Sequence, residues 1–175
     1  MTAPSTLRPL LTGGDRRDIA QASKALAIVK QNPALVAEVA ALTKDADWLV
    51  VQRAFDLLEK LAHEHPDWIE PHKLVFIGKH ALSDRWEIRL QIVRALPLFK
   101  WTAAQRKRVE EILLNGVKFP QTFVRAWSLD SLATLATQDA KLLPTVRRQL
   151  ALFARSESKA LQARARAIRE RLAIA

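Results

Sequence analysis

Apolar residues recur at helical spacing along most of the chain, and one arrangement of them occurs three times. The copies begin at Val50, Ile88 and Val124, so they are offset by 38 and 36 residues. A period of this length is typical of stacked helix-pair repeats. We predict that the repeated positions form the core. They are Val50, Ala54, Phe55, Leu58 and Leu61; Ile88, Ile92, Val93, Leu96 and Phe99; and Val124, Ser128, Leu129, Leu132 and Leu135.

Apolar spacing, capping residues and prolines together predict about nine helices and no strand. Ser83 or Asp84 is expected to cap the fifth helix, and Thr102 the sixth. We expect residues 1–14 to be a flexible N-terminal arm and residues 15–175 to form a single repeat domain. The expected helices cover about 15–32, 33–43, 45–65, 71–82, 84–99, 102–116, 120–137, 140–155 and 158–174.

Three segments resemble the first helix of the HEAT repeat, namely residues 47–55, 84–92 and 123–129. In two of them the first apolar residue is followed by arginine, whereas Val50 is followed by Val51. The resemblance covers roughly residues 15–155. It implies an all-α fold, a right-handed α-α superhelix (HEAT-like solenoid) of about four helix pairs with a C-terminal capping helix. HEAT arrays are mostly scaffolds whose inner face, lined by second helices, binds proteins, and a minority bind nucleic acid.

The repeat register also places charged residues at equivalent positions. Asp56, Arg94 and Asp130 each lie six residues after the start of a copy. In stacked repeats these positions are neighbours, so we expect an Asp–Arg–Asp ladder that helps to set the register. If exposed, each such pair contributes only about 0–1 kcal/mol.

The net charge of +10 is concentrated in the second half of the chain. Residues 1–87 carry 11 Lys/Arg and 12 Asp/Glu, a net charge of −1, whereas residues 88–175 carry 17 and 6, a net charge of +11. This asymmetry favours an anionic partner. The alternative is a basic surface without a ligand.

The expected second helices of the repeats carry much of this positive charge. We predict that the partner contacts one set of basic residues there: Arg106, Lys107, Arg108, Arg147, Arg148 and Arg155. Guanidinium and ammonium groups of this kind suit carboxylates and phosphates. In an alternative interpretation, Glu110 and Glu111 lie beside Arg147 and Arg148 and neutralise them.

Sequence motifs for chemistry are few. The chain has no cysteine, and the segment from His63 to His65 is too short for the His-Glu-x-x-His zinc spacing. It has no phosphate-binding glycine loop or nucleophile elbow either. We therefore expect no cofactor, no metal and no catalytic residue. We see no signal peptide and no apolar stretch long enough to span a bilayer, and expect a cytoplasmic protein.

The function we expect is that of a non-catalytic scaffold whose concave, basic face holds a protein partner. The positive charge of this face favours acidic segments of the partner. One alternative is binding of DNA or RNA through the phosphate backbone. A further alternative is an alkylpurine DNA glycosylase-like activity, since some bacterial glycosylases are built from HEAT-like repeats and use Trp, Asp and Arg. Trp127 and Asp130 are three residues apart and could share a helix face. The oligomeric state is left open.

Overall fold

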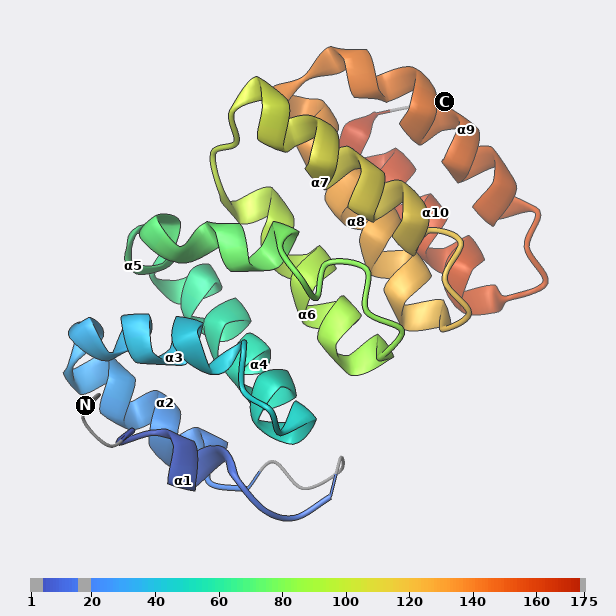
Figure 1. The fold of residues 1–175 in the computed structure, drawn as a ribbon. Coiled ribbons are helices and arrows are strands. Elements are labelled where there is room, and N and C mark those ends of the chain that lie inside the picture. Colours follow the sequence, from blue (N-terminus) through green and yellow to red (C-terminus); the bar gives the residue numbers. More distant parts are fainter. Residues whose placement is uncertain (1–4, 16–19, 174–175) are drawn as a thin grey trace. The chain divides into compact units, whose positions relative to one another are not determined.

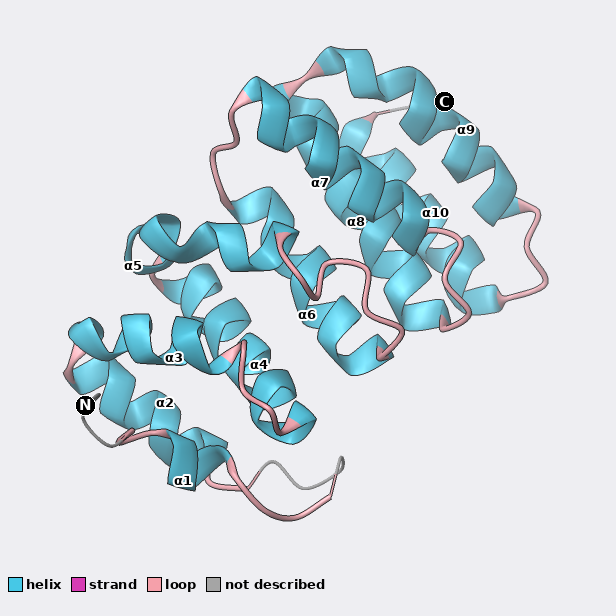
Figure 2. Ribbon diagram, in the orientation of Figure 1, coloured by secondary structure: helices cyan, strands magenta, loops and turns pink. Residues whose placement is uncertain are grey.

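The computed structural model describes residues 5–15 and 20–173. Within these ranges the chain contains α-helices and short 3-10 helices, joined by turns and loops, and no strand (Figure 2). The expected all-α class is therefore confirmed. The chain divides into two compact units, Met1–Gly78 and Lys79–Ala175, which we call unit 1 and unit 2. The prediction of a single domain over residues 15–175 stays a prediction.

Unit 1 is organised around its longest helix, α4. This helix packs against α1, α2, α3 and α5 (Figure 1). Asp47 caps it, because its side chain accepts a hydrogen bond from the Leu49 backbone N–H at 2.9 Å. The elements are α1 (Arg8–Leu11), α2 (Ala22–Gln31), η1 (Pro33–Leu35), α3 (Val36–Leu42), α4 (Trp48–Glu64), α5 (Pro66–Ile69) and η2 (Glu70–Ile77).

The described part of the expected N-terminal arm packs on unit 1. Leu7 and Leu11 are fully buried. The buried guanidinium of Arg53, on α4, donates hydrogen bonds to the backbone carbonyls of Leu11 at 2.6 Å and Asp15 at 3.1 Å. These contacts attach the short helix α1 to α4. The boundary predicted at residue 15 stays a prediction.

Unit 2 has two rows of helices. Helices α6, α8 and α10 form one row, with α8 packed against both of its neighbours. Helix α7 packs against α6 and α8, and α9 packs against α8 and α10, so these two helices form a second row (Figure 1). The elements are α6 (Trp86–Ala95), η3 (Leu96–Leu98), α7 (Ala103–Gly116), α8 (Thr122–Gln138), η4 (Ala140–Leu142), α9 (Leu143–Ala154) and α10 (Lys159–Leu172).

Helix α8 is the centre of unit 2 because its sequence allows burial on almost every side. Apolar and small residues are found all around it, and its interior is nearly free of large polar side chains. A helix with this composition is stable only when other helices cover it. Its buried residues are Val124, Ala126, Ser128, Leu129, Asp130, Ser131, Leu132, Ala133, Leu135 and Ala136.

The repeated core pattern predicted from the sequence is confirmed. None of its fifteen residues is more than 3% exposed. The capping prediction for Thr102 is also confirmed, since Thr102 and Gln105 form a reciprocal capping box at the start of α7. The prediction for the fifth helix was wrong. Its N-cap is Arg85, and Ser83 instead accepts a hydrogen bond from the Arg85 backbone N–H.

Two other helices start or end away from their expected bounds. Helix α2 begins at Ala22, not at Asp15, and residues 16–19 lie outside the described ranges. The segment expected as a helix over 71–82 is a 3-10 helix that ends at Ile77. Gly78 stops it, because its backbone angles (φ −86°, ψ −144°) are not helical.

Helices α7 and α8 approach each other closely at the end of α7. A Cβ atom placed on Gly116 would lie 2.9 Å from the Cβ and 2.1 Å from the Oγ of Ser128. Glycine is therefore required at this contact. Nearby, the Nη2 atom of the buried Arg89 donates a hydrogen bond to the Asn115 side chain at 2.8 Å. Burial lowers the pKa of the Arg89 guanidinium from its ordinary value.

Charged residues also connect the row formed by α6, α8 and α10. The buried carboxylate of Asp130 forms ion pairs with Arg164 at 3.1 Å and Arg171 at 2.7 Å, both on α10. The ring of Trp127 has the guanidinium of Arg94 5.0 Å from its centroid and that of Arg164 at 4.5 Å. These contacts give Trp127 and Asp130 a role in helix packing.

The ladder expected from the repeat register is not decided by these contacts. Asp130 pairs with residues of α10, and Arg94 lies over the Trp127 ring. Asp56 forms an ion pair with Lys60, one turn further along α4, at 2.7 Å. The ladder as a whole stays a prediction, because its first step would join the two units.

Candidate binding surface

The six basic residues predicted to contact a partner all lie in the second row of unit 2. Arg106, Lys107 and Arg108 are in the first turns of α7. Arg147 and Arg148 are in the first half of α9, and Arg155 is its C-cap. Unit 2 holds 19 Lys/Arg and 8 Asp/Glu, a net charge of +11, whereas unit 1 has a net charge of −1. The net positive charge of the chain therefore comes from unit 2.

Two of the basic residues on α7 are already ion-paired. Arg106 contacts Asp139, which precedes η4, at 3.1 Å. Arg108 contacts Glu111, one turn further along α7, at 2.8 Å. The pKa of Asp139 is lowered, mainly by a hydrogen bond from the Lys141 backbone N–H and secondly by one from the Arg106 guanidinium. Its carboxylate is therefore charged at neutral pH. The third predicted residue of α7, Lys107, forms no ion pair with a described residue.

The arginines of α9 have a different environment. The side chains of Arg147, Arg148 and Arg155 are exposed, and none of them forms an ion pair with a described residue. The alternative in which Glu110 and Glu111 neutralise Arg147 and Arg148 is therefore wrong, since Glu111 pairs with Arg108 instead. These arginines are exposed cations that an anionic partner can reach.

Helical spacing places these arginines on one face. Positions 151 and 155 lie four and eight residues after 147, and positions 151, 152 and 155 lie three, four and seven residues after 148, so all five line the solvent side of α9. Val146, Leu150 and Phe153 occupy the opposite side and are buried. With a rise of about 1.5 Å per residue, Arg155 lies roughly 11–12 Å along the helix from Arg147 and Arg148. We call Arg147, Arg148, Leu152 and Arg155 the α9 face; Leu152 is 59% exposed.

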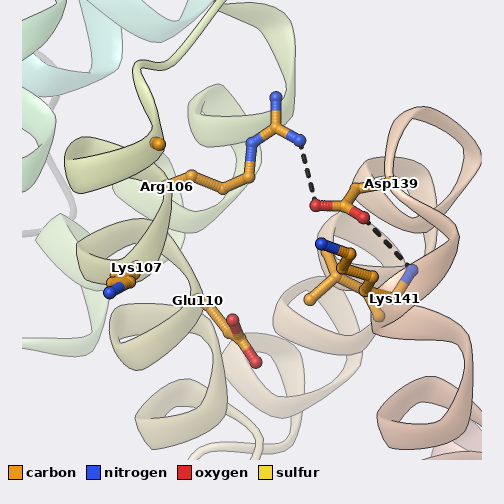
Figure 3. A pocket seen from close by; sticks show the side chains of 7 residues that line it. Arg106, Lys107, Glu110, Asp139 and Lys141 are labelled. Atoms are coloured by element: carbon orange, nitrogen blue, oxygen red, sulfur yellow. Dashed lines mark hydrogen bonds and ion pairs between the residues drawn. The ribbon is translucent and has the colours of Figure 1, made fainter.

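A pocket of about 500 Å³ opens between the first turns of α7 and the turn that leads into α9 (Figure 3). Arg106, Lys107 and Glu110 reach it from α7, and Asp139 and Lys141 from the other side. Ala103 and Leu142 complete its lining. The Arg106–Asp139 ion pair bridges the two sides of the pocket and so connects α7 to the segment that leads into α9.

Sequence reasoning missed Asp139, Lys141 and the pocket. Asp139 caps η4 by accepting a hydrogen bond from the Lys141 backbone N–H at 3.1 Å. An aspartate before a helical run is a recognisable capping signal. Its pairing with Arg106, which lies 33 residues earlier, depends on how α7 and α9 pack on α8. A local sequence pattern does not predict this packing.

Two features of the described residues bear on other functions. No helix among them combines the length and the apolar character needed to cross a membrane. Within residues 5–15 and 20–173, no three or more His, Asp or Glu side chains are grouped so that they could hold a metal ion.

No model of a known protein family matches this sequence, and no curated protein is similar to it. The assignment to the HEAT family therefore stays a prediction that depends on the residues quoted above.

Proposed function

We propose that the chain is a non-catalytic binding domain that holds an acidic segment of a partner protein on the second-row helices of unit 2. In this proposal α6–α7 and α8–α9 are HEAT-like helix pairs, and α10 is the capping helix. The two-row packing around α8 and the burial of the repeated core positions support this assignment. The α7 and α9 helices then line the binding surface.

The observation that carries the proposal is the α9 face. Three exposed arginines lie there on one side of a single helix, and no carboxylate of residues 5–15 and 20–173 forms an ion pair with them. Surface arginines pair readily with carboxylates, and the guanidinium group can hold a carboxylate through two parallel hydrogen bonds. An acidic peptide of about four residues in extended form would span the distance from Arg147 to Arg155.

An acidic protein fits this surface better than a nucleic acid does. On the neighbouring surface of α7 and η4, Glu111 and Asp139 are paired with arginines, whereas Glu110 forms no ion pair with a described residue. The Glu110 carboxylate repels a phosphate backbone, which carries a regular line of negative charge. A protein segment can place its acidic residues against the arginines and its neutral residues against Glu110.

Fluorescence anisotropy with the intact chain tests the proposal. We expect a labelled peptide with several Asp and Glu residues to bind, and its Gln/Asn analogue of the same length to bind much more weakly. Since the contacts are exposed charge pairs, affinity should fall as salt is raised from about 50 to about 200 mM. A duplex DNA of arbitrary sequence serves as the second ligand.

Three results would contradict the proposal. The first is no binding of the acidic peptide at low salt, and the second is equal binding of its neutral analogue. The third is duplex DNA binding more tightly than the peptide at equal salt, which would favour the nucleic-acid alternative.

A further inference from the structure

The pocket between α7 and η4 is lined by acidic as well as basic side chains. Lys107 and Lys141 line it, and the side chain of neither forms an ion pair with a described residue. Glu110 also lines it, with no cation of the described residues paired to its carboxylate. Arg106 and Asp139 are paired with each other. The groups left for a ligand are therefore two ammonium donors and one carboxylate acceptor.

This combination of groups discriminates between ligands. A carboxylate or a phosphate can accept hydrogen bonds from the two lysines. Only a ligand that also carries an N–H or O–H donor can donate a hydrogen bond to the Glu110 carboxylate. Each residue of a peptide other than proline has a backbone N–H, whereas the backbone within a DNA strand has only acceptors. A peptide with an acidic side chain therefore matches all three groups, and a DNA backbone leaves Glu110 opposed by negative charge.

The position of the pocket suits the same ligand. Its lining includes Asp139, Lys141 and Leu142 of the η4 segment, which leads directly into α9 and so toward Arg147 and Arg148. The Arg106–Asp139 ion pair connects its two sides, and Lys107 and Lys141 lie on opposite sides of the pocket (Figure 3).

We infer that this pocket is the anchor site of the binding surface, and that it takes an aspartate or glutamate side chain of the partner together with a neighbouring backbone N–H. Lys107 and Lys141 bind the carboxylate, and Glu110 accepts the N–H. The inference rests on the proposed function, and it goes beyond it by naming where an acidic residue is inserted and how a peptide is distinguished from a phosphate chain.

Opposite responses of two ligands to one substitution test the role of Glu110. Glu110→Ala removes a negative charge and an acceptor. If Glu110 accepts a peptide N–H, the acidic peptide should bind about threefold or more weakly to this variant, because a charge-assisted hydrogen bond is lost. A single-stranded oligothymidylate of equal net charge should bind more tightly, because only repulsion is removed. Tighter binding of both ligands would overturn the inference.

A charge-matched pair of variants tests the lysines. Lys107→Gln combined with Lys141→Gln should weaken binding of the acidic peptide about tenfold, since two charge pairs are lost. The control is Lys118→Gln combined with Lys159→Gln, which removes the same charge from exposed positions outside the pocket. Circular dichroism should show unchanged helicity in all variants.

The outcomes separate this inference from the proposed function. If the wild-type chain binds the acidic peptide and the pocket variants bind it as well as the control does, the pocket is not the anchor, while the proposed function stands. If the wild-type chain does not bind the peptide at all, the proposed function itself fails.

Discussion

Replacing Arg147 and Arg148 together with glutamate is expected to reduce the affinity for an acidic peptide roughly 30-fold, or about 2 kcal/mol. Each substitution removes an attractive pair and adds a repulsive one, and each of these effects amounts to about 0.5 kcal/mol for exposed groups. Neither side chain contacts the core of unit 2, because both lie on the solvent side of α9. The fold should therefore be retained.

A net-charge control is needed, since two reversals change the charge of the whole chain by four. Lys118→Glu with Arg166→Glu produces the same change at exposed positions away from the α9 face, on the α7–α8 connection and on α10. We expect this control to weaken binding only slightly in anisotropy titrations at physiological salt, where distant charges are screened. Equal losses in both double variants would show that overall charge, not the α9 face, determines binding.

Gly116→Ala is expected to destabilise the protein by about 1–3 kcal/mol, because an inserted methyl group would overlap Ser128 on α8. Ser128 could rotate its Oγ away, but its Cβ, at 2.9 Å, is fixed by the helix backbone. Relief requires α7 and α8 to separate. The helix propensity of alanine offsets at most about 1 kcal/mol of this cost, and less here because Gly116 is the last residue of α7.

Urea unfolding of a double-mutant cycle measures this effect. Ser128→Ala alone should change stability little, because the buried Oγ has no hydrogen-bond partner in the structure. In the Gly116→Ala background it should restore part of the lost stability by removing the closest atom. A Gly116→Ala variant as stable as the wild type, or simple additivity of the two substitutions, would show that the helices do not meet as described.

The sequence was sufficient to predict the core and the class of the fold. The fifteen positions of the three apolar copies are all buried, because the same helix face is covered in each copy. The capping box at Thr102 was also predictable, since both of its partners lie within four residues. Such features depend on the spacing of residues that are close in the sequence, so they can be predicted from the sequence alone.

The charge pairing of the candidate surface could not be predicted in the same way. Arg106 pairs with Asp139, and Asp130 with Arg164, at separations of 33 and 34 residues. These partners meet only because α7, α9 and α10 all pack on α8. The alternative interpretation placed Glu110 and Glu111 beside Arg147 and Arg148, but Glu111 pairs with Arg108 within its own helix. Competition between local and distant partners decided which cations stay available.

The central claim is that an acidic protein segment binds to the second-row helices of unit 2. Nuclear magnetic resonance of the ¹⁵N-labelled chain, titrated with the acidic peptide, tests it most directly. The claim predicts that backbone shift changes concentrate in residues 103–110 and 139–155, and that they disappear in the Arg147→Glu, Arg148→Glu variant. Changes confined to unit 1 or to the exposed side of α10, or an unchanged spectrum at high peptide concentration, would contradict it.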